Sequence, residues 1–178
     1  MSLRPLHLLG SPVLRERARE VGTPTAATAA FVADLFDTMR MADGVGLAAN
    51  QVGVAERVAV VDTHDGEPIV LIDPVIVERY GRERGEEGCL SIPDLFGEVE
   101  RATRIVVETT ALDGSRVRVE AVDLRARAVQ HEIDHLDGVL FVDHLSPLKR
   151  RMLLRKWDKQ RKGESGFIKT LVPAAEPG

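Results

Sequence analysis

The five residues His131-Glu132-Ile133-Asp134-His135 form an H-E-x-x-H motif, which constrains the fold because its spacing is chemically useful only on a helix. Side chains four positions apart on an α-helix lie on nearly the same face, about one turn apart. Two imidazoles so placed can bind one metal ion, and the adjacent glutamate can reach a water held by that metal. The motif predicts a metal-binding helix; the alternative is two ordinary histidines on a helix face.

The residues before the motif continue the helical pattern. Leu124 and Ala128 fall on the same stripe as the two histidines, and a second apolar stripe runs beside it. A helix with two such stripes is expected to be buried over much of its surface. Asp123 is expected to be its N-cap.

A third ligand is expected from Cys89, the single cysteine of the chain. Downstream of the motif only His144 is available, and it follows the turn at Gly138 too closely for the usual third ligand. A lone intracellular cysteine is more often a small buried hydrophobe. Here, however, Gly88 lets another group approach the backbone. A Cys-His-His set also leaves one tetrahedral position open for water, as a catalytic metal site requires.

Two other functions remain open at this point. A thiol enzyme with Cys89 as nucleophile and His131 as base predicts activity without metal and gives His135 no role. A non-catalytic protein with a structural metal requires a fourth protein ligand, and none is evident near the motifs.

A third motif, Gly44-Val45-Gly46-Leu47-Ala48-Ala49-Asn50-Gln51, lies upstream in a loop of small residues. By itself it is weak evidence, because a tight packing loop has the same composition. It lacks the G-x-x-x-x-G-K-[ST] pattern of a phosphate-binding loop.

Together the three motifs resemble the peptide deformylase family, which carries G-x-G-L-A-A-x-Q, E-G-C-L-S and Q-H-E-x-D-H in this order. Every fixed position is filled here, at residues 44–51, 87–91 and 130–135. The resemblance covers roughly residues 5–162. It implies a metal-dependent hydrolase that removes the N-formyl group from the N-terminal methionine of new polypeptides and releases formate.

The resemblance also implies roles for individual residues. Metal ligands would be Cys89, His131 and His135, and Glu132 would be the general base. The side-chain amide of Gln51 and the backbone N–H of Leu90 would stabilise the oxyanion. The metal would be Fe(II) in the cell, with Zn(II), Ni(II) or Co(II) able to replace it. The substrate methionine and peptide backbone would contact a group of five residues: Val45, Gly46, Gly88, Leu124 and Ala128.

Composition indicates a soluble globular protein. The 178 residues are 44% hydrophobic and 29% charged, which suits one domain. No apolar run approaches the roughly 18 residues that span a bilayer, and the N-terminus leads into no signal-peptide core. We therefore expect a cytoplasmic enzyme with neither a membrane partner nor a specific DNA partner.

The order of elements predicts an α+β fold, with antiparallel sheets around a central metal-binding helix and a further helix near the C-terminus. A helix is expected over residues 25–42. Strands are expected over 57–62, 69–72, 75–80, 103–112 and 116–122, the last two joined at Asp113-Gly114. Ser146-Pro147 begins the final helix. Residues 1–162 would form the catalytic domain, and 163–178 an extension that is either a strand or a loose tail.

Two charge patterns give further expectations. By resemblance, Arg101 in Val99-Glu100-Arg101 is expected to pair with Glu87 and support the loop that carries Cys89; the alternative is two solvated charges. From Lys149 to Lys162 there are eight basic residues and one acidic residue, so this segment carries +7 in a chain of net charge −4 and leaves −11 elsewhere. By resemblance this helix contacts the ribosome; the alternative is a solvated basic surface.

Overall fold

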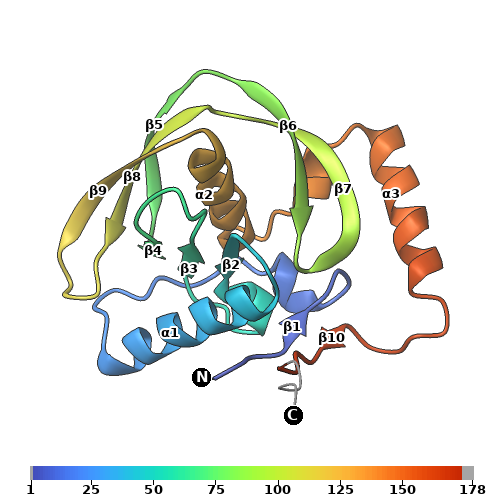
Figure 1. The fold of residues 1–178 in the computed structure, drawn as a ribbon, viewed down its shortest axis with the longest axis horizontal. Coiled ribbons are helices and arrows are strands. Elements are labelled where there is room, and N and C mark those ends of the chain that lie inside the picture. The colour runs from blue at the N-terminus through green and yellow to red at the C-terminus, as the bar shows by residue number, and fades with distance from the viewer. Residues whose placement is uncertain (1, 174–178) are drawn as a thin grey trace, which may run out of the picture.

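The computed structural model describes residues 2–173, in which curved antiparallel sheets surround one buried helix (Figure 1). The helices are α1 (Ala26–Met41), α2 (Asp123–Leu136) and α3 (Pro147–Gln160), with short 3-10 helices η1 (Pro12–Arg15), η2 (Ala49–Val52) and η3 (Phe141–His144). The strands are β1 (Leu6–His7), β2 (Gly46–Ala48), β3 (Val58–Val61), β4 (Ile69–Ile72), β5 (Val75–Tyr80), β6 (Glu83–Cys89), β7 (Ile92–Arg101), β8 (Arg104–Thr110), β9 (Arg116–Val122) and β10 (Ile168–Lys169).

The strands pair in four antiparallel groups: β1-β10, β2-β3-β4, β5-β8-β9 and β6-β7. Strand β5 leads directly into β6, and β7 into β8, so these two sheets arch over α2 in Figure 1. On the other side, β2-β3-β4 lies between α2 and α1. Helix α2 is therefore enclosed by sheets, as the α+β prediction required.

The core explains why α2 is central. Its residues Val129, Ile133 and Leu136 pack against apolar side chains of β3 and β8. A second cluster joins α1 to the other face of β2 and β3, and a third joins β7 to η3 and α3. Most of α2 from Ala126 onward is thus removed from water, as the two apolar stripes predicted, whereas its first residues are exposed.

Most of the predicted elements are present. Helix α1 and strands β3, β4, β5, β8 and β9 lie where the sequence predicts them, and Ser146 caps α3 by accepting a hydrogen bond from Lys149 N–H. The predicted N-cap of α2 is wrong by one residue: Val122 occupies that position and no side-chain cap forms. Asp123 instead donates its N–H to the carbonyl of Thr103, at a φ of 51°.

The β6-β7 hairpin was not predicted, although it has as many residue pairs as the β8-β9 hairpin. Its seven pairs run from Glu83–Arg101 to Cys89–Ile92, with an irregularity between Gly88 and Cys89. This hairpin brings Cys89 to the end of a strand, at a tight turn.

Within the extension, β10 pairs with β1, and Leu8 N–H donates to the carbonyl of Phe167 at 2.7 Å. Residues 174–178 lie outside the described part of the chain. Among residues 2–173, every helix is too short or too polar to cross a bilayer.

Candidate active site

Three potential ligand atoms converge between α2 and the β6-β7 hairpin. Cys89 Sγ lies 3.4 Å from His135 Nε2, and the two histidine Nε2 atoms are 3.1 Å apart. All three atoms lie within 4.8 Å of one another, and both histidines are buried. A thiolate and two imidazoles facing one point form a donor set that fits a divalent transition metal. In the described residues this group has three members, which leaves a tetrahedral ion one open position.

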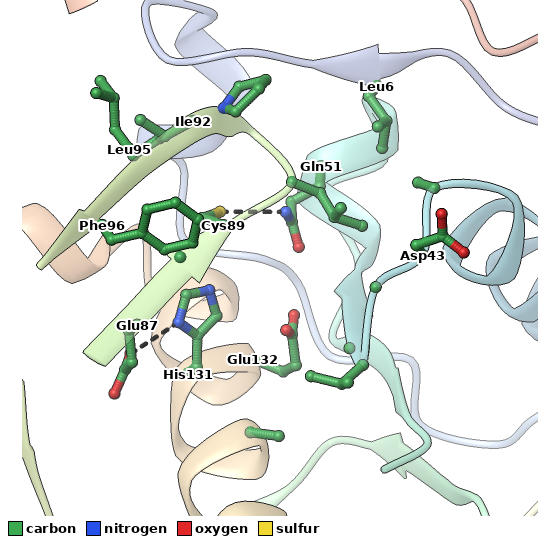
Figure 2. A pocket seen from close by; sticks show the side chains of 18 of the residues that line it. Leu6, Asp43, Gln51, Glu87, Cys89, Ile92, Leu95, Phe96, His131 and Glu132 are labelled. Carbon is green, nitrogen blue, oxygen red and sulfur yellow. Dashed lines mark hydrogen bonds and ion pairs between the residues drawn. The ribbon is translucent and has the colours of Figure 1, made fainter. Parts of the chain in front are cut away.

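Glu87 holds the outer side of His131. Its Oε1 accepts a hydrogen bond from His131 Nδ1 at 2.9 Å, which turns Nε2 toward Cys89 (Figure 2). Arg101 donates to both oxygens of Glu87, at 2.9 Å each, so the predicted ion pair is confirmed. Burial alone would raise the pKa of Glu87, but the hydrogen bonds from Arg101 and His131 lower it to about 2. The carboxylate therefore stays ionised and fixes the ring of His131.

Glu132, the residue after His131, lines the cleft. The residue is 4% exposed, and its Oε2 has no hydrogen-bond partner among the described residues. Burial raises the pKa of Glu132 to about 7. Gly46 of β2 packs directly on this carboxylate, where a Cβ atom would lie 2.9 Å from its Cδ. An unpartnered carboxylate with a pKa near neutrality is suited to exchanging protons.

Gln51 and Leu90 are both close to Cys89: Gln51 contacts its sulfur, and Leu90 follows it in the chain. Gln51, in η2, places Nε2 3.5 Å from Cys89 Sγ and 3.1 Å from Ser91 Oγ, while its Oε1 accepts from Ala48 N–H. Leu90 occupies the β6-β7 turn and packs against Gly44. The small residues of the Gly44–Gln51 motif thus let η2 and β2 approach the hairpin closely.

A cleft of about 620 Å³ opens from these residues to the surface. All five residues expected to contact substrate line it: Val45, Gly46, Gly88, Leu124 and Ala128. Sequence reasoning missed Leu6, Phe96 and Leu171, which also line it. Leu6 and Leu171 come from the β1-β10 pair, and no local pattern could have placed them here. Phe96 is exposed on β7, and its position follows only from the hairpin register.

Arg127 was not assigned a role by the sequence, and it proves to belong to this site. Its Nη1 donates to Glu87 Oε2 at 2.7 Å and to the carbonyl of Val99 at 2.8 Å. Its Nη2 donates to the carbonyl of Glu83 at 2.8 Å.

A metal-binding group beside a buried, unpartnered carboxylate at the base of an open cleft defines the class of metal-dependent hydrolases. Comparison with known proteins shows which family within this class the chain belongs to. Residues 3–151 match the model of the polypeptide deformylase family, to which the chain belongs. Members of this family remove the formyl group from the N-terminal methionine of new polypeptides, in a metal-dependent hydrolysis that releases formate.

Several peptide deformylases are similar to this protein over nearly its whole length. The peptide deformylase of Rhizobium meliloti is 47% identical over 91% of this chain and 96% of its own. That of Acidobacterium capsulatum is 44% identical over 92% of this chain and 99% of its own. The crystal structure from Legionella pneumophila superposes with a TM-score of 0.85 at 42% identity, covering 90% and 96% of the two chains. The Ehrlichia chaffeensis enzyme in complex with actinonin gives 0.87 at 33% identity, covering 93% and 100%.

Proposed function

We propose that Cys89, His131 and His135 bind one divalent metal ion, Fe(II) in the cell, and that Zn(II), Ni(II) or Co(II) can replace it. The convergence of their three ligand atoms supports this assignment. Such an ion supplies Lewis-acid chemistry, which makes water a nucleophile near neutral pH and polarises a carbonyl oxygen. The choice of Fe(II) rests on family resemblance, since a thiolate with two imidazoles accommodates each of these metals.

Glu132 is the proton carrier of the proposed reaction. It accepts a proton from the water that attacks the formyl carbon, and it later returns that proton to the departing amine. Its buried, unpartnered oxygen and its place in the cleft support this role. The amine product and formate then leave through the cleft.

The oxyanion that forms on the formyl oxygen requires donors aimed at it. We assign this task to Gln51 Nε2, which lies 3.5 Å from Cys89 Sγ, and to the backbone N–H of Leu90, the residue after Cys89. Both residues line the cleft, and the amide of Gln51 is held by its contacts with Ala48 and Ser91.

The substrate methionine is proposed to enter the apolar part of the cleft, against Val45, Leu124 and Ala128. The peptide backbone would lie extended beside Gly46 and Gly88, where the absence of side chains allows strand-like pairing. We expect turnover of formyl-Met peptides to exceed that of formyl-Asp peptides by a wide margin.

Two substitutions test the division between metal binding and proton transfer. Cys89→Ala is expected to lose metal, because only two ligands remain. Glu132→Ala is expected to keep stoichiometric metal and the fold, while kcat falls on the order of 100- to 10,000-fold. Metal content and turnover are measured on both proteins. Stoichiometric metal in Cys89→Ala, or full turnover in Glu132→Ala, contradicts the assignment.

Removal of the metal by a chelator separates this function from the thiol enzyme. The proposed reaction stops on chelation and resumes when a divalent metal is added back. A thiol enzyme that uses Cys89 and His131 keeps its activity without metal.

For its cellular setting, we propose that the enzyme acts in the cytoplasm and contacts the ribosome through α3. Leu153 and Trp157 are buried against the body, while Arg155, Lys156 and Lys159 are exposed and can meet phosphates. Arg161 is less suitable than the sequence suggested, because it pairs with Glu164 at 3.1 Å and lies over the Trp157 ring.

The ribosome contact is tested by changing Arg155, Lys156 and Lys159 together to Glu. We expect co-sedimentation with ribosomes at low salt to fall, while activity on a free formyl peptide is retained. Unchanged co-sedimentation with intact peptide activity means that the basic face is only solvated surface.

A further inference from the structure

The proposed metal site is divided between two elements that are far apart in the sequence. Cys89 ends strand β6, whereas His131 and His135 belong to α2. The distance from the thiolate to the imidazoles therefore depends on how the β6-β7 hairpin sits against α2. Misplacement of one ligand weakens metal binding, so the contacts that fix this hairpin bear directly on the site.

Arg127 makes the most extensive polar contact between α2 and this hairpin. It lies one helical turn before His131, and its side chain is 15% exposed. The guanidinium reaches the carbonyls of Glu83 on β6 and Val99 on β7, and also the carboxylate of Glu87. One planar group thus binds both strands of the hairpin: β6, which ends at Cys89, and β7, which follows it.

The hairpin leaves a space for this guanidinium. Gly85, on β6, has no side chain where Arg127 passes, and a Cβ atom there would lie 3.0 Å from Arg127 Cζ. Arg101 also reaches α2, where it donates to Asp134 at 2.6 Å, but its bonds to the hairpin go to the Glu87 side chain and not to the backbone of either strand. Arg127 comes from α2, so its bonds join the two elements.

We propose that Arg127 is a positioning residue that holds Cys89 in place relative to His131 and His135 and thereby governs how long the metal is retained. The guanidinium acts through the hairpin backbone and Glu87, and makes no bond to the metal itself. This inference rests on the proposed metal site.

The test compares Arg127→Met with Arg125→Met, its matched control on the same helix. Arg125 also donates to a backbone carbonyl, that of Glu67 at 2.9 Å, but far from the hairpin. Each protein is loaded with Co(II) and mixed with excess EDTA, and the loss of the cobalt–thiolate absorption is followed with time. Arg127→Met is expected to release Co(II) on the order of 10- to 100-fold faster, and Arg125→Met at the native rate.

Two further variants guard against a fold defect. Arg127→Lys keeps the charge but offers one ammonium group, which cannot span both strands, so its release rate should fall between the native and Arg127→Met rates. Gly85→Ala removes no side chain of the site but crowds the Arg127 guanidinium, so it should also accelerate release. Equal release from Arg127→Met and Arg125→Met overturns the proposal, as does native-like release from Gly85→Ala if Arg127→Met does not fold.

The native protein in the same experiment tests the site itself. If it binds no Co(II), the proposed metal site is wrong. If it binds Co(II) stoichiometrically and the variants release it at the native rate, only the role of Arg127 is wrong.

Discussion

Glu87 and Glu132 are two buried carboxylates of one site, and their different surroundings shift their pKa values in opposite directions. Four side-chain nitrogens contact Glu87, from Arg101, Arg127 and His131, and its pKa falls to about 2 although burial opposes this. Burial raises the pKa of Glu132 to about 7, and its Oε2 has no partner among the described residues. One carboxylate is thereby a fixed support and the other is available to react.

The contact of Gly46 with Glu132 gives a prediction at this scale. In Gly46→Ala the new Cβ would overlap Oε1 of Glu132, so the carboxylate must move by about 1 Å, which typically costs on the order of 100-fold in rate. Metal content should stay stoichiometric, because the three atoms nearest to the new Cβ all belong to Glu132, which is not a proposed ligand. Steady-state kinetics with metal analysis measures both.

Gly66→Ala is the control for this glycine substitution. Gly66 is exposed, and a Cβ there approaches only the end of the Arg125 side chain. Wild-type turnover in Gly46→Ala would show that Glu132 can leave its observed position without loss of function.

At the scale of elements, the sequence predicted the helices and strands whose apolar residues recur at a regular spacing. The apolar spacing of α1 and α2, the β-branched runs of β3 and β8, and the Ser146-Pro147 start of α3 were all predictable. The β6-β7 hairpin was not, because Gly85, Gly88 and Pro93 are poor strand formers and β6 is mostly exposed. Its pairing is stabilised by tertiary contacts, notably those of Arg101 and Arg127, which no local window contains.

Likewise, the motifs predicted which residues gather at the site but not how the second layer holds them. Glu87–Arg101 could be anticipated from family resemblance. Arg127 reaches its acceptors across 28 to 44 residues of sequence. Such a contact follows from the arrangement of α2 against the hairpin and from nothing local.

The contact between η1 and η3 predicts how the stability of the fold depends on pH. Asp143 accepts hydrogen bonds from Arg15 at 2.6 Å and from Leu140 N–H at 2.9 Å. Burial alone would raise the pKa of Asp143, but these bonds hold it below its usual value. The folded-state pKa is thus lower than the unfolded one, so the stabilisation is present above about pH 4 and is lost as pH falls through the folded pKa.

We therefore expect Asp143→Asn to be less stable than the native protein at neutral pH, by no more than about 1 kcal/mol because the pair is partly exposed. The two proteins should converge in stability in acid. Urea unfolding across this pH range measures the difference, with Asp158→Asn on the exposed side of α3 as control. A difference that grows as pH falls contradicts the sign of the shift.

At the scale of the whole molecule, the cleft is assembled from segments that are distant in sequence. Leu6 from β1, Val45 before β2, Leu90 from the hairpin turn, Leu124 from α2 and Leu171 after β10 all line it. The β1-β10 pair, at the lower edge of the molecule in Figure 1, brings the extension back to the site. Residues 163–173 therefore help to shape the cleft, although the motifs all lie within residues 44–135.

This arrangement predicts the effect of removing the extension. A chain that stops after Lys162 loses β10, the Phe167 carbonyl that accepts from Leu8 N–H, and the apolar contact of Leu171 with the α1 cluster. Exposing Leu6 and losing the Leu171 contact lowers the free energy of unfolding by about 2 kcal/mol. For a chain of this size, that lowers Tm by about 4–8 °C. KM for formyl-Met peptides should rise several-fold because Lys169 and Leu171 line the cleft, while kcat changes little because the proposed catalytic groups remain. A chain that stops after Pro173 is the control and should match the native protein in Tm and KM. If the chain that stops after Lys162 matches it too, residues 1–162 are sufficient and the extension contributes nothing to the cleft.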